Sequence, residues 1–80
     1  MKASDIEKII HLYDDERKAA ESCRERADKE KNPDIRRIYY STAAGHMTRA
    51  AAIENVLNVL GYIVVKINMQ ERASYKIVKE

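Results

Sequence analysis

Residues 38–61 read IYYSTAAGHMTRAAAIENVLNVLG, and before the closing glycine only Arg49 and Glu54 carry a formal charge. In the whole chain of 80 residues, 35% are charged. The outer side of a solvated helix usually carries charged side chains. A helix so nearly free of charge is therefore expected to be buried on two sides, and what covers each side decides the fold.

The surrounding sequence predicts a long antiparallel helical hairpin. A capping-box pattern, SDIE at 4–7, predicts that the first helix spans about 5–31. Asn-Pro at 32–33 suits a helix cap followed by the first helical position, which predicts a tight turn and a second helix over 33–60. Gly61 is a typical left-handed helix stop. Two long helices joined this tightly must fold back on each other.

The pattern changes after this glycine. The segments YIVVKIN and SYKIVKE are rich in β-branched residues and predict strands at about 62–68 and 74–79, paired as a β-hairpin. The fold class is then α+β, mainly α, in a single domain of residues 1–80. A third helix is the alternative, because apolar residues recur four apart at Val65, Met69, Ala73 and Ile77.

One stripe of the second helix is expected to face the first helix, at about 100° per residue. The stripe consists of Ile35, Tyr39, Thr42, His46, Ala50, Ile53, Leu57 and Leu60. The matching face of the first helix consists of Ile6, Ile9, Tyr13, Ala20, Cys23 and Ala27. In this antiparallel arrangement, the sequence positions of two residues that face each other add up to about 66. This register sets large side chains against small ones.

The opposite side of the second helix carries small, uncharged side chains. It consists of Ser41, Ala44, Thr48, Ala51, Ala52, Asn55 and Val59. Small residues allow helices to approach closely and lose little entropy on burial. We expect this back face to be an interface, covered by the β-hairpin or by a second subunit. The alternative is that alanine fills an exposed helix because it favours helix formation.

Size and composition favour an oligomer, a dimer first of all. A chain of 80 residues without Trp or Phe has little with which to build a core, and association is a usual remedy. The single cysteine, Cys23, fits a reducing cytoplasm. No signal peptide is expected, and the polar residues within 38–60 argue against a membrane span.

A polar cluster is expected on the seam between the helices. His46 and Arg49 lie one turn apart, and Glu16 should arrive at the same level. A carboxylate, an imidazole and a guanidinium among small side chains suit a small anionic ligand, such as a nucleotide signal. The alternative is a satisfied polar network that fixes the register of the helices.

No cofactor, metal site or catalytic residue is predicted. His46 and Cys23 lack a third ligand for zinc, and no nucleotide-binding or nucleophile motif is present. Arginines near the turn could contact nucleic acid, although acidic residues in the same turns offset their charge. These arginines are Arg24, Arg26, Arg36 and Arg37.

The function expected from these features is protein–protein interaction without catalysis, as an adaptor or inhibitor with an unidentified protein partner. In size and helical-hairpin layout the chain resembles small accessory proteins of bacteriophages and mobile elements. That resemblance gives no individual residue a role. The function that it implies is to block a host defence enzyme. A small-ligand binder and a nucleic-acid-binding accessory protein are the alternatives.

Overall fold

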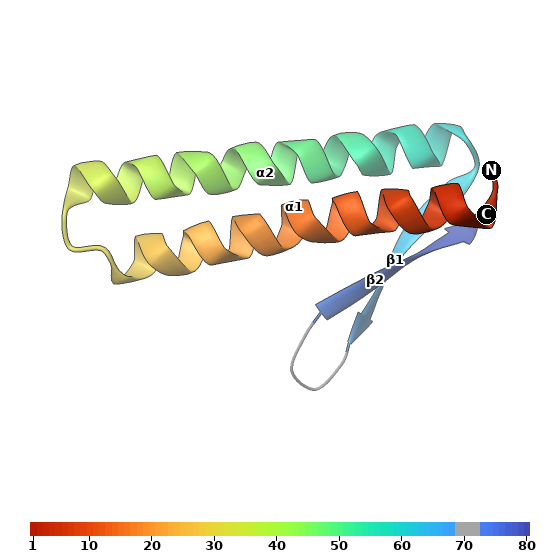
Figure 1. Ribbon diagram of the computed structural model, residues 1–80. Coiled ribbons are helices and arrows are strands. Elements are labelled where there is room, and N and C mark those ends of the chain that lie inside the picture. The colour runs from red at the N-terminus through yellow and green to blue at the C-terminus, as the bar shows by residue number, and fades with distance from the viewer. Residues whose placement is uncertain (69–72) are drawn as a thin grey trace.

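A computed structural model describes residues 1–68 and 73–80 of the chain, and it confirms a helical hairpin followed by a β-hairpin (Figure 1). The elements are α1 (Ala3–Lys29), α2 (Pro33–Val59), β1 (Tyr62–Asn68) and β2 (Ala73–Lys79). The strands are antiparallel, with Tyr62 opposite Lys79 and Lys66 opposite Tyr75. The alternative of a third helix is wrong, because its positions fall in the two strands, apart from Met69, which lies outside the described residues.

Helix α1 does not begin with the predicted capping box. Lys2 occupies the cap position, without a side-chain hydrogen bond. The backbone N–H groups of Asp5 and Ile6 both donate to the Lys2 carbonyl, at 3.1 Å. The helix therefore begins at Ala3, and Ser4 lies within its first turn instead of at the cap position. The predicted start at residue 5 is wrong by two positions.

The turn between the helices forms as the sequence predicts. The Asn32 side chain accepts hydrogen bonds from the backbone N–H groups of Asp34 at 2.9 Å and Ile35 at 3.4 Å. The Arg36 guanidinium reaches back and donates twice to the Glu30 carbonyl, at 3.0 and 2.8 Å. Side chains on either side of the turn thereby cap backbone groups at both helix ends.

The helices meet along two series of residues spaced by seven, the repeat of a coiled coil. The buried core consists of Tyr13, Ala20 and Ala27 on α1 and Ala43, Ala50 and Leu57 on α2. The predicted register is confirmed, because the cross-helix hydrogen bonds join Tyr13 to Glu54 and Asp28 to Tyr40.

The predicted inward stripe of α2 is rotated from the observed one. Ala43 is buried, whereas Thr42, Ile35 and Leu60 are exposed. A stripe drawn at 100° per residue drifts relative to a seven-residue repeat, which is the period that a packed antiparallel pair keeps. The error therefore comes from applying the geometry of an isolated helix to a supercoiled pair.

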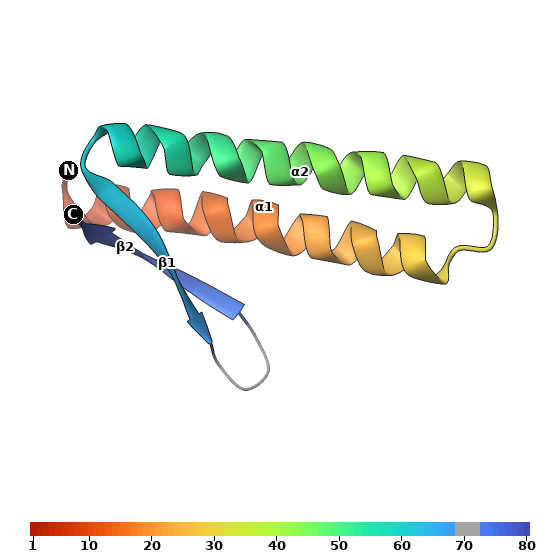
Figure 2. The same ribbon diagram turned by 180° about the vertical axis from the view of Figure 1, so that it is seen from behind.

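A left-handed glycine connects the helical pair to the β-hairpin. Gly61 has a φ of 86°, and its carbonyl accepts a hydrogen bond from the Glu80 backbone N–H at 2.8 Å. The β-hairpin then lies across one face of the helical pair, where β1 contacts α2 and β2 contacts α1 (Figure 2).

The molecule is elongated, with principal extents of 46 × 28 × 18 Å and a radius of gyration of 14.5 Å. A compact domain of this length has a radius of gyration of about 11.6 Å. Among the residues whose burial the structure describes, the largest fully buried side chains are Tyr13 and Leu57. Within the described residues, no helix combines the length and apolar character that a membrane span requires.

Candidate functional site

The β-hairpin divides the helical pair into two faces. We call the side under the hairpin the covered face; Tyr13, Arg17 and Met47 contribute to it, and Tyr75 of β2 contacts the first two. We call the opposite side the open face. At 100° per residue, Ile38 and Val56 lie about 180° around α2 from Met47 and therefore on the open face.

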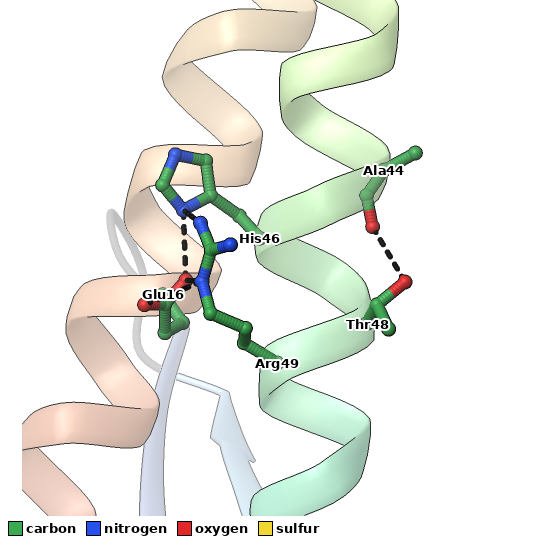
Figure 3. A network of polar contacts seen from close by, with 5 residues as sticks. All are labelled: Glu16, Ala44, His46, Thr48 and Arg49. Atoms are coloured by element: carbon green, nitrogen blue, oxygen red, sulfur yellow. Dashed lines mark hydrogen bonds and ion pairs between the residues drawn. The ribbon is translucent and has the colours of Figure 1, made fainter.

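The predicted ligand residues come together on the open face (Figure 3). Glu16 lies on α1, and its carboxylate is 2.7 Å from Nδ1 of His46 on α2. Nε of Arg49 donates to both carboxylate oxygens of Glu16 at 3.1 Å. In Figure 3 the three side chains stand in front of the helices, with the strands passing behind.

The triad pairs the charge of Glu16 with that of Arg49. The hydrogen bond with His46, and then the bonds from Arg49, hold the pKa of Glu16 below its usual range, so its carboxylate is charged at neutral pH. His46 Nδ1 also lies 2.8 Å from Nη2 of Arg49. One ring nitrogen cannot donate to Glu16 and accept from Arg49 at once. Glu16 thus pairs with both partners, while the Arg49 side chain stays 58% exposed and its Nη groups make no bond to Glu16.

The predicted interface on the back of α2 is exposed along its whole length in the single chain. All seven residues, from Ser41 to Val59, are exposed. The β-hairpin packs elsewhere, on the covered face, so the alternative that it covers this back face is wrong. The hydroxyls of Thr42 and Thr48 donate hydrogen bonds to the backbone carbonyls of Ile38 and Ala44, four residues earlier in the same helix.

A stripe of apolar and small residues runs along the outer side of α2, next to the triad. We call it the outer stripe, and it consists of Ile38, Gly45, Ala52, Val56 and Val59. Ile38 is 63% exposed, Val56 is 61% and Val59 is 86%. Four of these five residues are spaced by seven, the same repeat as the buried seam. The sequence signal was present, but only two of the five were in the predicted interface.

The structure does not gather the four predicted nucleic-acid arginines on one surface. Arg24 and Arg26 are two residues apart on α1 and project about 200° apart, whereas Arg36 and Arg37 on α2 project about 100° apart. The Arg36 guanidinium is also bound to the Glu30 carbonyl. Only Arg24 lines the pocket on the covered face.

A second cluster, on the covered face, was not predicted from the sequence. The ring of Tyr13 meets that of Tyr75 edge-on, with centroids 5.0 Å apart. The guanidinium carbon of Arg17 lies 5.9 Å from the centre of the first ring and 5.3 Å from that of the second. Nε of Arg17 donates to the Tyr75 hydroxyl at 3.1 Å.

The Tyr13 hydroxyl completes this cluster by donating to the Glu54 carboxylate at 2.7 Å. Burial, reinforced by that hydrogen bond, raises the pKa of Tyr13 far above its ordinary value, so the hydroxyl stays protonated. Since Tyr75 lies 58 residues from Arg17 in the chain, the cluster could be predicted only by knowing which face the β-hairpin covers.

Among residues 1–68 and 73–80, no three His, Cys, Asp or Glu side chains lie together as metal ligands would. No family model, curated protein or solved structure matches the chain. The candidate sites are therefore the triad and outer stripe on the open face and the aromatic–arginine cluster on the covered face.

Proposed function

We propose that this protein is a non-enzymatic protein–protein interaction module that works as a homodimer, with the two copies packed along the outer stripe of α2. The observation that carries the proposal is excess surface. One chain exposes 6102 Å², whereas a folded monomer of 9.2 kDa exposes about 4,900 Å². The excess, about 1,200 Å², exceeds the ~800 Å² that each partner contributes to a standard interface.

The outer stripe also suits a two-fold symmetric partner. If two copies of α2 pair antiparallel about an axis near Thr48 and Arg49, Ile38 faces Val59 of the partner subunit, and Gly45 faces Ala52 of the partner subunit. Bulky side chains then meet at the ends of the contact, and small ones let the helices approach closely at its centre.

The triad suits such an interface as well. Arg49 would lie near the two-fold axis, where two arginines would repel each other. Glu16 of the same chain holds each guanidinium through two 3.1 Å bonds. The triad is then a means of neutralising charge within each copy, in keeping with a network that fixes register.

The wider assignment is an adaptor or inhibitor acting in the cytoplasm, where the free thiol of Cys23 is stable. A dimer leaves the charged outer side of α1 and the exposed parts of the β-hairpin available to a further protein. The proposal includes a role as a small accessory protein that blocks a host enzyme, because such an inhibitor needs only a suitable shape and surface.

Light scattering of the wild type, Ala52→Glu and Ser22→Glu tests the dimer. Ala52 and Ser22 are both exposed helical residues, but only the first lies on the outer stripe. A dimeric wild type is expected, with Ala52→Glu weakening association on the order of a hundredfold because a charge is buried without a partner. Ser22→Glu should leave association unchanged. A wild type that stays monomeric at every concentration would overturn the proposal.

Ala44→Glu locates the interface more finely. Ala44 is an exposed alanine on the same helix, about 80° around α2 from Ala52. The outer-stripe dimer predicts that Ala44→Glu has the smaller effect on association. A larger effect would centre the interface on the back face predicted from the sequence instead.

A further inference from the structure

A small pocket opens on the covered face between the helices and the β-hairpin. Its volume is about 120 Å³, and its walls include Arg17, Arg24, Lys66 and Tyr75. Ala20 and Met47 complete the apolar part of the wall, and Glu21 is its single acidic residue. Three cations against one carboxylate give the pocket a net positive charge.

Arg17 is unusual among the basic residues of this chain. Every other Lys or Arg whose exposure the structure describes is exposed, whereas Arg17 is part-buried. Within the described residues, the only ion pairs join Lys18 to Asp14 and Glu16 to His46 and Arg49. No described carboxylate therefore makes an ion pair with Arg17, although Glu54 lies near enough to raise the pKa of the guanidinium.

The contacts of Arg17 orient it without using all its donors. Nε donates to the Tyr75 hydroxyl at 3.1 Å, and Nη1 points at the Met47 sulfur at 3.8 Å. A guanidinium has five N–H groups, so most of its donors have no acceptor among the described residues. Although burial acts to lower the pKa of Arg17, its hydrogen bond to Tyr75 and the nearby acidic groups raise it overall, so the group is charged.

Lys66 and Tyr75 are opposite each other in the β-hairpin and so project to the same side of it. The Tyr75 hydroxyl accepts from Arg17, which leaves its own proton available to a ligand. The pocket therefore combines a fixed guanidinium, a hydroxyl donor and two further cations, Arg24 and Lys66, at its rim.

We propose that this pocket binds a phosphate-sized oxyanion, either free phosphate or the phosphate group of a larger molecule. A volume of about 120 Å³ is several times what one water molecule needs, and it is small for a whole drug-sized ligand. Only the phosphate would be enclosed, and any group attached to it would extend into solvent. The site shares no residue with the triad or the outer stripe, so it stands independently of the dimer.

Calorimetric titration with inorganic phosphate and, separately, with phenyl phosphate tests the proposal at low salt. The wild type should bind phosphate, and Lys66→Gln should weaken binding about five- to tenfold, as expected for the loss of one charge-assisted contact. Tighter binding of phenyl phosphate would indicate that the natural ligand is a phosphate ester; equal binding would indicate free phosphate.

Lys76→Gln is the matched control. Lys76 is exposed on the same β-hairpin, but it follows Tyr75 directly and so projects to the opposite side of the strand. It should bind phosphate as the wild type does. Equal losses in Lys66→Gln and Lys76→Gln would reduce the binding to general electrostatics and overturn the site, as would no heat of binding in the wild type.

Arg17→Met provides a second readout that does not depend on weak binding. It keeps the long side chain and removes the charge. In phosphate-free buffer its Tm should lie below that of the wild type, because the hydrogen bond to Tyr75 and the two ring contacts are lost. Added phosphate should raise the Tm of the wild type only. A phosphate-induced rise in Tm of the same size in Arg17→Met would contradict the proposal.

Discussion

The covered and open faces of the helical pair carry polar clusters of opposite character, although both lie at the same level of the seam. Glu16 and Arg17 are consecutive residues of α1, and a step of about 100° sends one to each face. On the open face, Glu16 neutralises Arg49 and contacts His46. On the covered face, Arg17 contacts a hydroxyl and two aromatic rings.

The difference shows how a third element changes the chemistry of a symmetric seam. Two helices alone can match charge with charge, as they do on the open face. The β-hairpin brings aromatic and β-branched side chains, which provide area and a hydroxyl but no carboxylate. The covered face thus gains aromatic packing around Arg17, which makes no ion pair among the described residues.

The largest expected effect comes from removing the side chain that anchors the covered face. Tyr13 is 2% exposed, and Tyr13→Ala should lower the free energy of unfolding by about 3–5 kcal/mol. Tyr13→Phe removes only the hydrogen bond to Glu54 and should cost about 1.5 kcal/mol. Urea unfolding at fixed protein concentration measures both.

Leu12→Ala is the matched control on the open face. Leu12 is the preceding residue but is 60% exposed, so its truncation should cost less than about 1 kcal/mol in a single chain. A cost as large as that of Tyr13→Ala would contradict the contrast between the faces, since it would require that Leu12 is buried in solution.

An intermediate effect is expected at the junction that directs the β-hairpin onto its face. Nothing lies within 4 Å of a Cβ added at Gly61, so Gly61→Ala tests the backbone alone. Its φ of 86° is unfavourable for alanine, and we expect a loss of about 1–2 kcal/mol. Thermal unfolding of the wild type and the variant, analysed with the same heat-capacity change, measures this difference in the free energy of unfolding.

Gly45→Ala sharpens the same comparison in the opposite direction. In the middle of α2, a Cβ there would meet only Arg49 Nη1, at an ordinary 3.8 Å. Alanine favours a helix interior over glycine by up to about 1 kcal/mol, so this variant should be more stable in a monomeric state. A loss of stability in both glycine variants would show that Gly45 is kept small by a contact absent from the single chain.

The smallest effect is expected for Glu16→Gln, and it depends on pH. Because contacts with His46 and Arg49 lower the folded pKa of Glu16 from 4.5, its stabilising contribution is present above that value. It is lost as pH falls through the lower folded pKa. The Tm of Glu16→Gln should lie below that of the wild type at pH 7, and the gap should narrow below about pH 4.5.

Glu25→Gln is the control for this pH dependence. Glu25 is an exposed glutamate of the same helix, and it makes no ion pair among the described residues. Its variant should follow the wild type at every pH. If the difference in Tm between the wild type and Glu16→Gln does not change on acidification, the charge of Glu16 in the triad does not contribute to the stability of the helical pair.

Local signals in the sequence predicted the elements well. Asn32, Pro33 and Gly61 each act through their own backbone neighbours, and the structure uses them as expected. The enrichment in β-branched residues after Gly61 likewise predicted both strands. The capping-box prediction was wrong because the backbone N–H groups of Asp5 and Ile6 donate to the Lys2 carbonyl, which starts the helix before Ser4.

What the sequence could not predict depends on contacts between distant segments. The triad was predicted because the turn sets the register of two adjacent helices. The aromatic–arginine cluster was missed because either face of the pair could have received the β-hairpin. Periodicity shows that a helix has a second apolar side, but it does not show which element covers it.

The seam also has a direction. Near the turn, the buried residues are the small Ala27 and Ala43, and the hydrogen bond from Tyr40 to Asp28 spans only 12 residues. Near the junction, Tyr13 and Leu57 supply the bulk of the burial, and the bond from Tyr13 to Glu54 spans 41 residues. Short loops close at lower entropic cost. Folding is therefore expected to begin where the seam is thinnest and to finish where it is most stable, with docking of the β-hairpin as its last step.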